Sequence, residues 1–295
     1  MLSPSPRDGV LTTLHSPRGS YDIEREIGKG THSIVFLAKS RSNTTENKLV
    51  ALKRLDRRKI SSDLFNMVKK EAEFLQRLVH PNIVLLQEVF DDGPYLCIVL
   101  DYYSGGDLLF RVNNGGNIPE CRIKQYTKQI ATGLRFAHNN GIIHRDIKLE
   151  NILLDETGTV VVICDWGYAT NYKEGRRQIG AVGSPHYAAP ELHRGDPYEG
   201  PEIDSWALGV VIYAMVFRSL PWKTHNTNTN TNNSKEEALR KVKRLILTVD
   251  YPIPENTDPL LIDLITRLLK HEQTLRLNMQ EILDHGWLDE CYKRD

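Results

Sequence analysis

Cysteine, net charge and long apolar runs are all scarce in this sequence of 295 residues. The four cysteines, Cys97, Cys121, Cys164 and Cys291, include no C-x-x-C pair. This spacing argues against a zinc site or a disulfide framework and favours reduced thiols in an intracellular protein, cytoplasmic or nuclear. Lysine plus arginine and aspartate plus glutamate each number 38, so the charge balance gives no general attraction to nucleic acid or to an anionic membrane.

The longest apolar run, Trp206–Phe217, has twelve residues, whereas a bilayer-spanning helix needs about 20. The first residues lack the basic start and continuous apolar stretch of a secretory signal. No repeat of fixed period occurs. We therefore expect a folded protein without a membrane segment, long enough to bury a core without disulfide or metal support.

Composition and periodicity divide the chain into segments. Residues 1–20 are rich in Ser, Pro, Gly and Thr, which predicts a disordered tail. Residues 21–103 hold short β-type runs at 34–38, 49–55, 83–90 and 95–102, and one amphipathic helix at 61–78 that Ser61 or Ser62 could cap. Residues 104–287 are mainly helical, with an antiparallel strand pair at 151–155 and 160–165, and 288–295 form a tail. The helices are expected at 107–113, 119–139, 203–218, 235–247, 258–269 and 278–284.

This pattern predicts an α+β protein with a small N-terminal sheet lobe carrying one long helix and a larger, mainly helical C-terminal lobe. The polar Asn/Thr tract 225–234 is expected to be a surface loop before the helix at 235–247.

The first candidate site is the glycine-containing turn Ile27–Val35. Gly28 and Gly30 would let the backbone approach a phosphate closely, although a plain β-turn explains them equally well. Lys53 lies inside an apolar strand, where a lysine normally points to solvent. Glu71, on the helix that follows, could orient it, as a lysine that grips phosphates requires.

The second candidate site is the polar loop His144–Asn151, which lies between apolar runs. Asp146 could accept a proton from a hydroxyl group, and Lys148 could neutralise a migrating phosphoryl group. Asn151 offers an amide oxygen and Asp165, at the end of a strand, offers a carboxylate, and Mg²⁺ prefers such oxygen ligands.

With these motifs the chain resembles the eukaryotic Ser/Thr protein kinases over about residues 21–290, and most of all the calcium/calmodulin-dependent and AMP-activated kinase group. The resemblance is based on HRDIKLEN (144–151), DWG (165–167), Ala189-Pro190-Glu191, the Asp204-x-Trp206-x-x-Gly209 pattern and Arg276. It implies a bilobal kinase fold and transfer of the γ-phosphoryl group of Mg-ATP to serine and threonine hydroxyls of protein substrates.

The resemblance also implies a role for each residue. Lys53 would bind the α- and β-phosphates and pair with Glu71, Asp146 would orient or deprotonate the hydroxyl, Lys148 would contact the γ-phosphate, and Asn151 and Asp165 would hold Mg²⁺. The backbone of Asp101 and Tyr103 would bond adenine, Leu100 would guard the pocket behind it, and Asp107 would meet the ribose. The remaining nucleotide-binding residues implied are Ile27, Gly28, Lys29, Gly30, Val35, Ala51, Glu150 and Leu153.

Other residues are implied to support the site or to bind the substrate. Glu191 and Arg276 would form a buried ion pair, and Asp204, Trp206 and Gly209 would support the loop around Asp146. The Ser184 hydroxyl would bond both Asp146 and Lys148. Asp107 and Glu150 would receive basic residues, which predicts Arg or Lys about three residues before the acceptor.

Three positions depart from the family pattern. Ser33 replaces the third glycine, Trp166 replaces a phenylalanine, and Gly180 stands where related kinases carry a phosphorylatable threonine. Arg145, which clamps that phosphate in relatives, is present. Our hypothesis is that no phosphorylation is needed at position 180, with Glu174 or a partner engaging Arg145.

Two alternatives remain beside an active Ser/Thr kinase. A pseudokinase acting as a scaffold or allosteric module is disfavoured by the intact Lys53, Glu71, Asp146, Asn151 and Asp165. A kinase of small molecules is disfavoured by the long activation segment, which contains residues 169–183 and precedes Ala189-Pro190-Glu191. The partners expected are protein substrates, with a regulatory protein left open and neither nucleic acid nor membrane.

Overall fold

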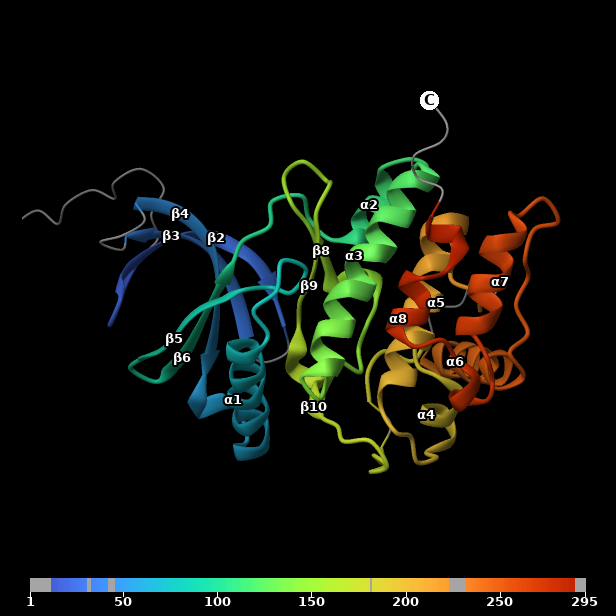
Figure 1. Cartoon of the computed structure of the whole chain (residues 1–295). Coiled ribbons are helices and arrows are strands. Elements are labelled where there is room, and N and C mark those ends of the chain that lie inside the picture. Colours follow the sequence, from blue (N-terminus) through green and yellow to red (C-terminus); the bar gives the residue numbers. More distant parts are fainter. Residues whose placement is uncertain (1–11, 31–32, 42–45, 181, 223–231, 290–295) are drawn as a thin grey trace, which may run out of the picture. The chain divides into compact units, whose positions relative to one another are not determined.

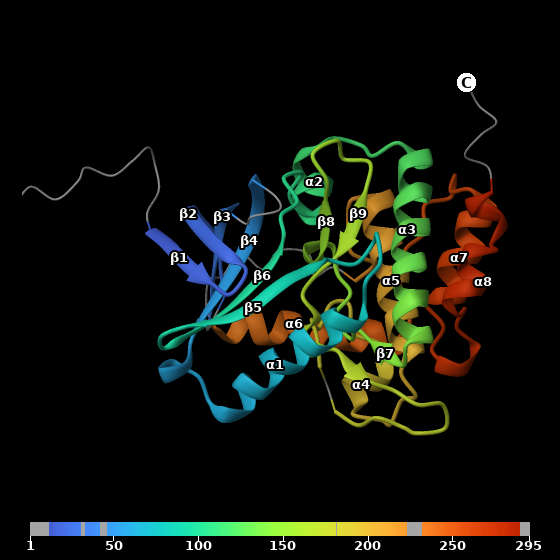
Figure 2. The same ribbon diagram turned by 60° about the vertical axis from the view of Figure 1, so that its left-hand side comes forward.

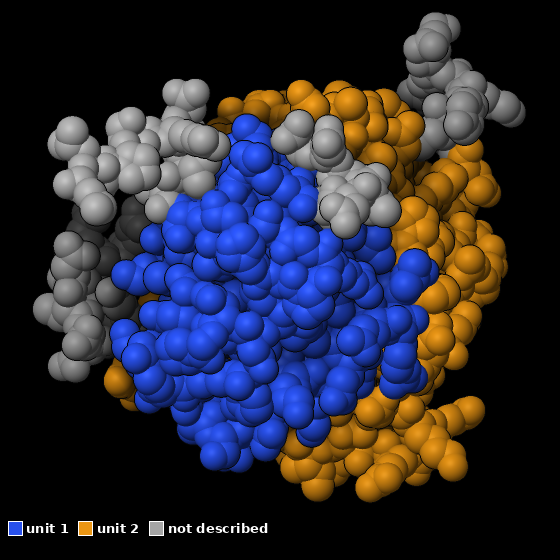
Figure 3. Space-filling view, turned by 90° about the vertical axis from the view of Figure 1, so that its left-hand side faces the viewer, with its two compact units in different colours: residues 1–79, 84–103 blue, residues 80–83, 104–295 orange. Residues whose placement is uncertain are grey.

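The computed structural model describes residues 12–30, 33–41, 46–180, 182–222 and 232–289. The chain forms two compact units: unit 1 contains residues 1–79 and 84–103, and unit 2 contains residues 80–83 and 104–295 (Figure 3). Residues 290–295 of the predicted tail 288–295, including Cys291, lie outside the described residues. Most of the Asn/Thr tract 225–234 also lies outside them. Of the cysteines that the structure describes, Cys97 is buried, Cys121 is exposed and Cys164 is half-buried.

Unit 1 contains one antiparallel six-stranded sheet in the order β1-β2-β3-β4-β6-β5 (Figure 1). Its strands are β1 (Thr12–Ser16), β2 (Gly19–Lys29), β3 (Ser33–Arg41), β4 (Glu46–Asp56), β5 (Leu86–Asp92) and β6 (Tyr95–Asp101). One face carries a core that includes Tyr21, Ile23, Leu52 and Val99. Alternation along each strand therefore leaves residues such as Lys53, next to Leu52, on the opposite face.

The prediction of a disordered tail is wrong for residues 12–20. These residues form β1, the turn and the start of β2, with Leu14 paired to Tyr21 across the hairpin. Leu14 is buried in the core of unit 1, and the Ser16 hydroxyl donates to Glu88 at 2.8 Å. Burial of a single leucine and pairing with a neighbouring strand outweigh the composition of the segment. Residues 1–11 lie outside the described part of the chain.

Helix α1 (Ser62–Arg77) covers the Lys53 face of the sheet within unit 1. The Ser61 hydroxyl caps it by accepting a hydrogen bond from the Leu64 amide at 3.2 Å, as predicted. Val68 packs with Leu55 and Leu96 of the sheet. Glu71 is the charged member of this buried face, which places its carboxylate against the sheet.

Unit 2 is mainly helical, with α3 and α5 packed against each other (Figure 2). Because α5 is apolar almost all round, it is buried on every side. The helices are α2 (Leu108–Asn114), α3 (Glu120–Asn139), α4 (Pro190–Arg194), α5 (Pro201–Phe217), α6 (Asn232–Thr248), α7 (Pro259–Leu268) and α8 (Met279–Leu283). No helix in the described ranges is both long and apolar enough to cross a membrane.

Short strands complete unit 2. β7 (Ile142–Ile143) pairs with β10 (Thr170–Asn171), and β8 (Ile152–Leu154) pairs with β9 (Val161–Ile163) in antiparallel register. The predicted pair at 151–155 and 160–165 is therefore present. Because β7 and β8 flank residues 144–151, the polar loop is held at both ends. The α+β class and the segregation of sheet and helices agree with the prediction.

Candidate active site

The first cluster of the candidate site lies in unit 1. Lys53 Nζ donates to both carboxylate oxygens of Glu71, at 2.8 and 3.1 Å. The Glu71 side chain is 3% exposed and that of Lys53 is 19% exposed. A nearly buried carboxylate thus fixes the head of a partly exposed lysine side chain, and the predicted pair is present.

The register of the sheet brings further predicted residues to the same face. Gly28 lies opposite Val35, and Val35 lies opposite Lys53. Ala51, two residues from Lys53, lies opposite Leu100. Residues opposite each other in an antiparallel pair share a face, so these five side-chain positions line one surface of unit 1.

The glycine turn is built for close approach. Ile27 occupies a β-bulge between Glu26 and Gly28, Lys29 ends β2, and the Gly30 amide donates to the Ser33 carbonyl at 2.8 Å. A Cβ at Gly28 would meet only Val35, at an ordinary 3.7 Å. Packing in unit 1 therefore does not require this glycine, which is consistent with a backbone kept open for a phosphate.

The last residues of unit 1 are Asp101 and Tyr103. The Asp101 amide donates a hydrogen bond to the Leu85 carbonyl at 3.0 Å. The Asp101 carboxylate accepts one from Lys48 at 2.6 Å. Burial, together with the charge of Asp101, raises the pKa of the Tyr103 hydroxyl to about 12. The Asp101 side chain is therefore engaged in an ion pair and the Tyr103 hydroxyl stays neutral, while their backbone contacts to adenine remain a prediction.

The second cluster lies in unit 2 and centres on Asp146, which is 3% exposed. Asp146 Oδ2 accepts from Lys148 Nζ at 2.7 Å and from Asn151 Nδ2 at 3.1 Å, and Oδ1 accepts from the Ser184 amide at 2.8 Å. The carboxylate is thus held in one orientation by three donors. Burial would lower the pKa of Lys148, but the hydrogen bond and charge of Asp146, with Glu150 and Asp165, raise it.

His144 and Asp204 hold the loop around Asp146. Asp204, fully buried at the start of α5, accepts from the amides of His144 at 2.9 Å and Arg145 at 2.8 Å. His144 Nδ1 accepts from the Asp146 amide at 3.2 Å, so Nε2 carries the proton and donates to the Cys164 carbonyl at 3.0 Å. Burial opposes the charge of Asp204, but its hydrogen bond with His138 Nε2 at 2.8 Å, together with the bond from the His144 amide, lowers its pKa. The predicted supporting role of Asp204 is visible in these bonds.

The oxygen donors proposed for Mg²⁺ fit that ion. Asn151 uses its amide nitrogen to bind Asp146, at the backbone carbonyl (2.8 Å) and at Oδ2, which leaves the amide oxygen as its remaining ligand atom. Asp165 follows β9 in a left-handed conformation, φ 57°, and is exposed. The residues that the structure describes contain no group of three or more His, Cys, Asp or Glu suited to a metal. Two oxygen donors fit an ion that completes its shell with phosphates and water.

The prediction for Ser184 needs a correction. Its hydroxyl accepts from Lys148 Nζ at 2.9 Å, but its backbone amide, not its hydroxyl, bonds Asp146. The reason is local: Gly183 has φ 84°, and a Cβ there would come within 2.4 Å of the Arg145 carbonyl. This close approach turns the Ser184 amide toward Asp146, and only glycine permits it.

Arg145 has partners within unit 2. Its Nε donates to the Tyr168 carbonyl at 2.7 Å and its Nη1 to the Tyr198 hydroxyl at 3.1 Å. Tyr198 is fully buried, and its backbone forms an antiparallel bridge with Gln178 of the activation segment, at 2.7 and 3.1 Å. The hypothesis that Glu174 engages Arg145 is not supported. Among the described residues, Arg145 does not bond to Glu174, whose side chain is exposed.

A groove in unit 2 has Ser184 in its wall. It has a volume of about 510 Å³ and includes Glu150, Tyr187 and Arg218 in its wall. The Tyr187 hydroxyl donates to Glu150 at 3.4 Å. Asp107 bridges to Leu153 and caps α2 through Oδ1, which accepts from the Phe110 amide at 2.7 Å. One oxygen of Asp107 is therefore committed to the helix.

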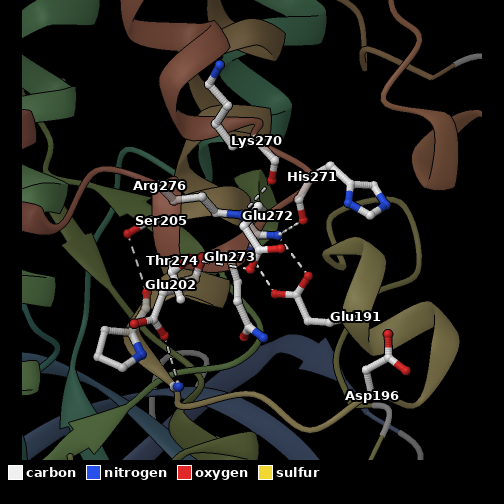
Figure 4. A network of polar contacts seen from close by, with 12 residues as sticks. Glu191, Asp196, Glu202, Ser205, Lys270, His271, Glu272, Gln273, Thr274 and Arg276 are labelled. Carbon is white, nitrogen blue, oxygen red and sulfur yellow. Dashed lines mark hydrogen bonds and ion pairs between the residues drawn. The ribbon is translucent and has the colours of Figure 1, made fainter.

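The predicted ion pair of Glu191 and Arg276 is buried (Figure 4). Arg276 donates to the two Glu191 oxygens at 2.6 and 2.7 Å and to the carbonyls of Lys270, Glu202 and His271 at 2.9, 3.2 and 3.3 Å. These five bonds match the five N–H donors of a guanidinium group. The guanidinium also lies 4.9 Å from the centre of the Trp206 ring. Arg276 thus ties α4 to α5 and to the segment after α7.

Sequence reasoning missed Tyr198, Gly183 and Tyr187 as parts of the site. Tyr198 belongs to no periodic apolar pattern, and its bond to Arg145 joins residues 53 positions apart. Gly183 and Tyr187 flank Ser184, which the sequence did single out. Their proximity to Ser184 is the one signal that could have pointed to them.

Comparison with known proteins matches residues 21–288 to the protein kinase domain. Serine/threonine-protein kinase SIK1 of Mus musculus is 33% identical over 270 residues, covering 92% of this chain and 33% of that protein. NUAK family SNF1-like kinase 2 of Homo sapiens is 33% identical over 280 residues, covering 94% of this chain and 42% of that protein. The chain therefore spans less than half the length of these relatives.

Proposed function

The chain belongs to the protein kinase domain family, and from this premise we propose that it transfers the γ-phosphoryl group of Mg-ATP to serine and threonine hydroxyls of proteins. The resemblance drawn from the sequence motifs to kinases is thereby confirmed. The observation that carries the proposal is the orientation of Asp146 by Lys148, Asn151 and the Ser184 amide. The kinase names of the relatives favour this activity over a pseudokinase scaffold.

The division of roles follows from the needs of phosphoryl transfer, which are alignment and charge neutralisation rather than covalent help. Bound Mg²⁺ would neutralise charge on the phosphates, held by the oxygens of Asn151 and Asp165. Lys53, fixed by Glu71, would bind the α- and β-phosphates. Lys148, kept protonated beside Asp146, would contact the γ-phosphate, while Asp146 aligns the acceptor hydroxyl and accepts its proton.

We predict a preference for Arg or Lys about three residues before the acceptor, read by Glu150 and the free oxygen of Asp107. Glu150 is exposed in the wall of the groove that includes Ser184, so a peptide there would meet its charge. In a positional peptide array, Glu150→Gln should reduce the preference for Arg over Ala at that position by about fivefold.

The matched control is Glu156→Gln, at an exposed glutamate in the turn between β8 and β9. This variant should leave the array pattern as in the wild type. A wild-type preference for acidic residues at that position, or for proline directly after the acceptor, would contradict the prediction.

We further propose that the activation segment works without phosphorylation at position 180. What supports this is the bonding of Arg145 to Tyr168 and Tyr198, together with the conformation of Gly180. Its φ of 120° strains any side chain, so the segment is shaped around a glycine. Arg145 binds the Tyr198 hydroxyl instead of a phosphate group, and this contact does not depend on phosphorylation by another kinase.

Phosphatase treatment of the pure protein should therefore leave its peptide kinase rate unchanged within about twofold, and Tyr198→Phe should lower the rate because Arg145 loses a hydrogen bond. Mass spectrometry before and after treatment verifies the removal of phosphate. Loss of activity on treatment would contradict the proposal and direct attention to Thr170, Tyr172 and Ser184. We also propose an intracellular location, cytoplasmic or nuclear.

A further inference from the structure

The groove that includes Ser184 carries a second charge besides that of Glu150. Arg218, directly after α5, is exposed and lines the same 510 Å³ groove. Its backbone has φ 51°, in the left-handed region where a non-glycine side chain is uncommon. The chain thus presents an arginine at a position whose conformation would suit glycine better.

Contacts with α2 fix this arginine. Arg218 Nε donates to the Val112 carbonyl and Nη2 donates to the Asn113 carbonyl, both at 3.2 Å. These are carbonyls of the last turn of α2, where the helix dipole favours a cation. Two bonds use two of the five N–H donors of a guanidinium, so the group is held without being saturated.

The remaining wall of the groove is largely apolar or uncharged, including Leu109, Leu149, Pro185 and Leu220. Among its described residues, the only Asp, Glu, Lys or Arg members are Glu150 and Arg218, of opposite sign, and His186 also lines it. A guanidinium that is already oriented binds a carboxylate with little further loss of side-chain freedom, because its rotamer is set in advance. The groove is therefore complementary in charge to a peptide segment that carries one basic and one acidic side chain.

We infer that Arg218 is a specificity-determining residue that selects an acidic side chain in the substrate. The occupant is an extended segment of the protein substrate. Its basic residue lies at Glu150, and its Asp or Glu lies farther from the acceptor, at Arg218. This inference depends on the proposed function, because it assigns part of the specificity of the same site. A substrate with basic residues at both positions is disfavoured.

A positional peptide array with the full chain tests this inference. The wild type should prefer Asp or Glu over Lys at one position beyond the basic residue, by about fivefold in kcat/KM. Arg218→Gly, which suits the backbone conformation, should abolish this preference. Arg218→Glu should reverse it toward Lys and Arg. The preference at the position read by Glu150 should persist in both variants.

The matched control is Arg240→Glu, the same charge change at an exposed arginine of α6 that does not line the groove. It should leave the acidic preference intact, and melting temperatures should verify that the variants fold. An acidic preference that is absent in the wild type, or that persists in both Arg218 variants, would overturn the inference. Absence of phosphorylation on every peptide would instead count against the proposed function.

Discussion

Replacing Asp146 by Asn should lower kcat for peptide phosphorylation by about 10²- to 10⁴-fold, with little change in the KM for ATP. The carboxylate is 3% exposed and is oriented by the side chains of Lys148 and Asn151 and the amide of Ser184. An asparagine has nearly the same shape but is a poor acceptor of the substrate proton. It also removes the negative charge that raises the pKa of Lys148.

The measurement is the initial rate of phosphate transfer from labelled ATP to a basic serine peptide. Asp196→Asn, at an exposed aspartate just after α4, is the matched control and should keep the wild-type rate. Equal melting temperatures for the two variants would separate loss of chemistry from loss of fold. An unchanged rate in Asp146→Asn would mean that the measured activity belongs to a contaminant.

Removing the charge of Glu191 should destabilise the protein by about 3–5 kcal/mol, because Arg276 would remain as a buried charge without a counter-ion. The side chains of Arg276 and Glu191 are 0% and 4% exposed. We expect Glu191→Gln to shift urea unfolding by this amount without changing the m-value. Three carbonyls would still accept from Arg276, so its guanidinium would stay in the interior.

The double variant Glu191→Gln/Arg276→Met should lose less stability than the sum of the two single variants, since neither buried charge remains. The matched control is Glu236→Gln, which breaks the exposed pair of Glu236 and Arg240 at 3.4 Å. It should change the free energy of unfolding by less than about 1 kcal/mol. Additivity of the double variant, or a loss in Glu191→Gln as small as in the control, would contradict the account.

Periodicity was sufficient to predict most of the fold. The expected helix at 119–139 is present as α3, Glu120–Asn139, because its apolar residues recur at helical spacing over many turns. The short α4 gave no such signal, since five residues from Pro190 to Arg194 span little more than one turn. The hairpin at 12–20 was missed because its Ser-Pro composition concealed a strand with a single buried leucine.

Contacts in the site could be predicted from the sequence when both partners had distinctive side chains, such as a pair of opposite charges. A lysine in a strand and a glutamate on an apolar helix face suggested the pair Lys53–Glu71, 18 residues apart. Nothing comparable predicted that Arg218 would bind the Val112 carbonyl, 106 residues away, because every residue has a carbonyl. The same reasoning placed Ser184 correctly but not the choice between its amide and its hydroxyl, which depends on backbone geometry at Gly183.

The claim on which the account depends is that a magnesium nucleotide is held by Asn151 and Asp165 for transfer to a hydroxyl group. The most direct measurement is anomalous diffraction from crystals grown with Mn²⁺ and a non-hydrolysable ATP analogue. The account predicts an anomalous peak about 2.0–2.2 Å from the Asn151 amide oxygen and from an Asp165 carboxylate oxygen, with phosphate oxygens completing the shell. A nucleotide bound with its ion away from both residues, or no bound nucleotide at saturating concentration, would contradict it.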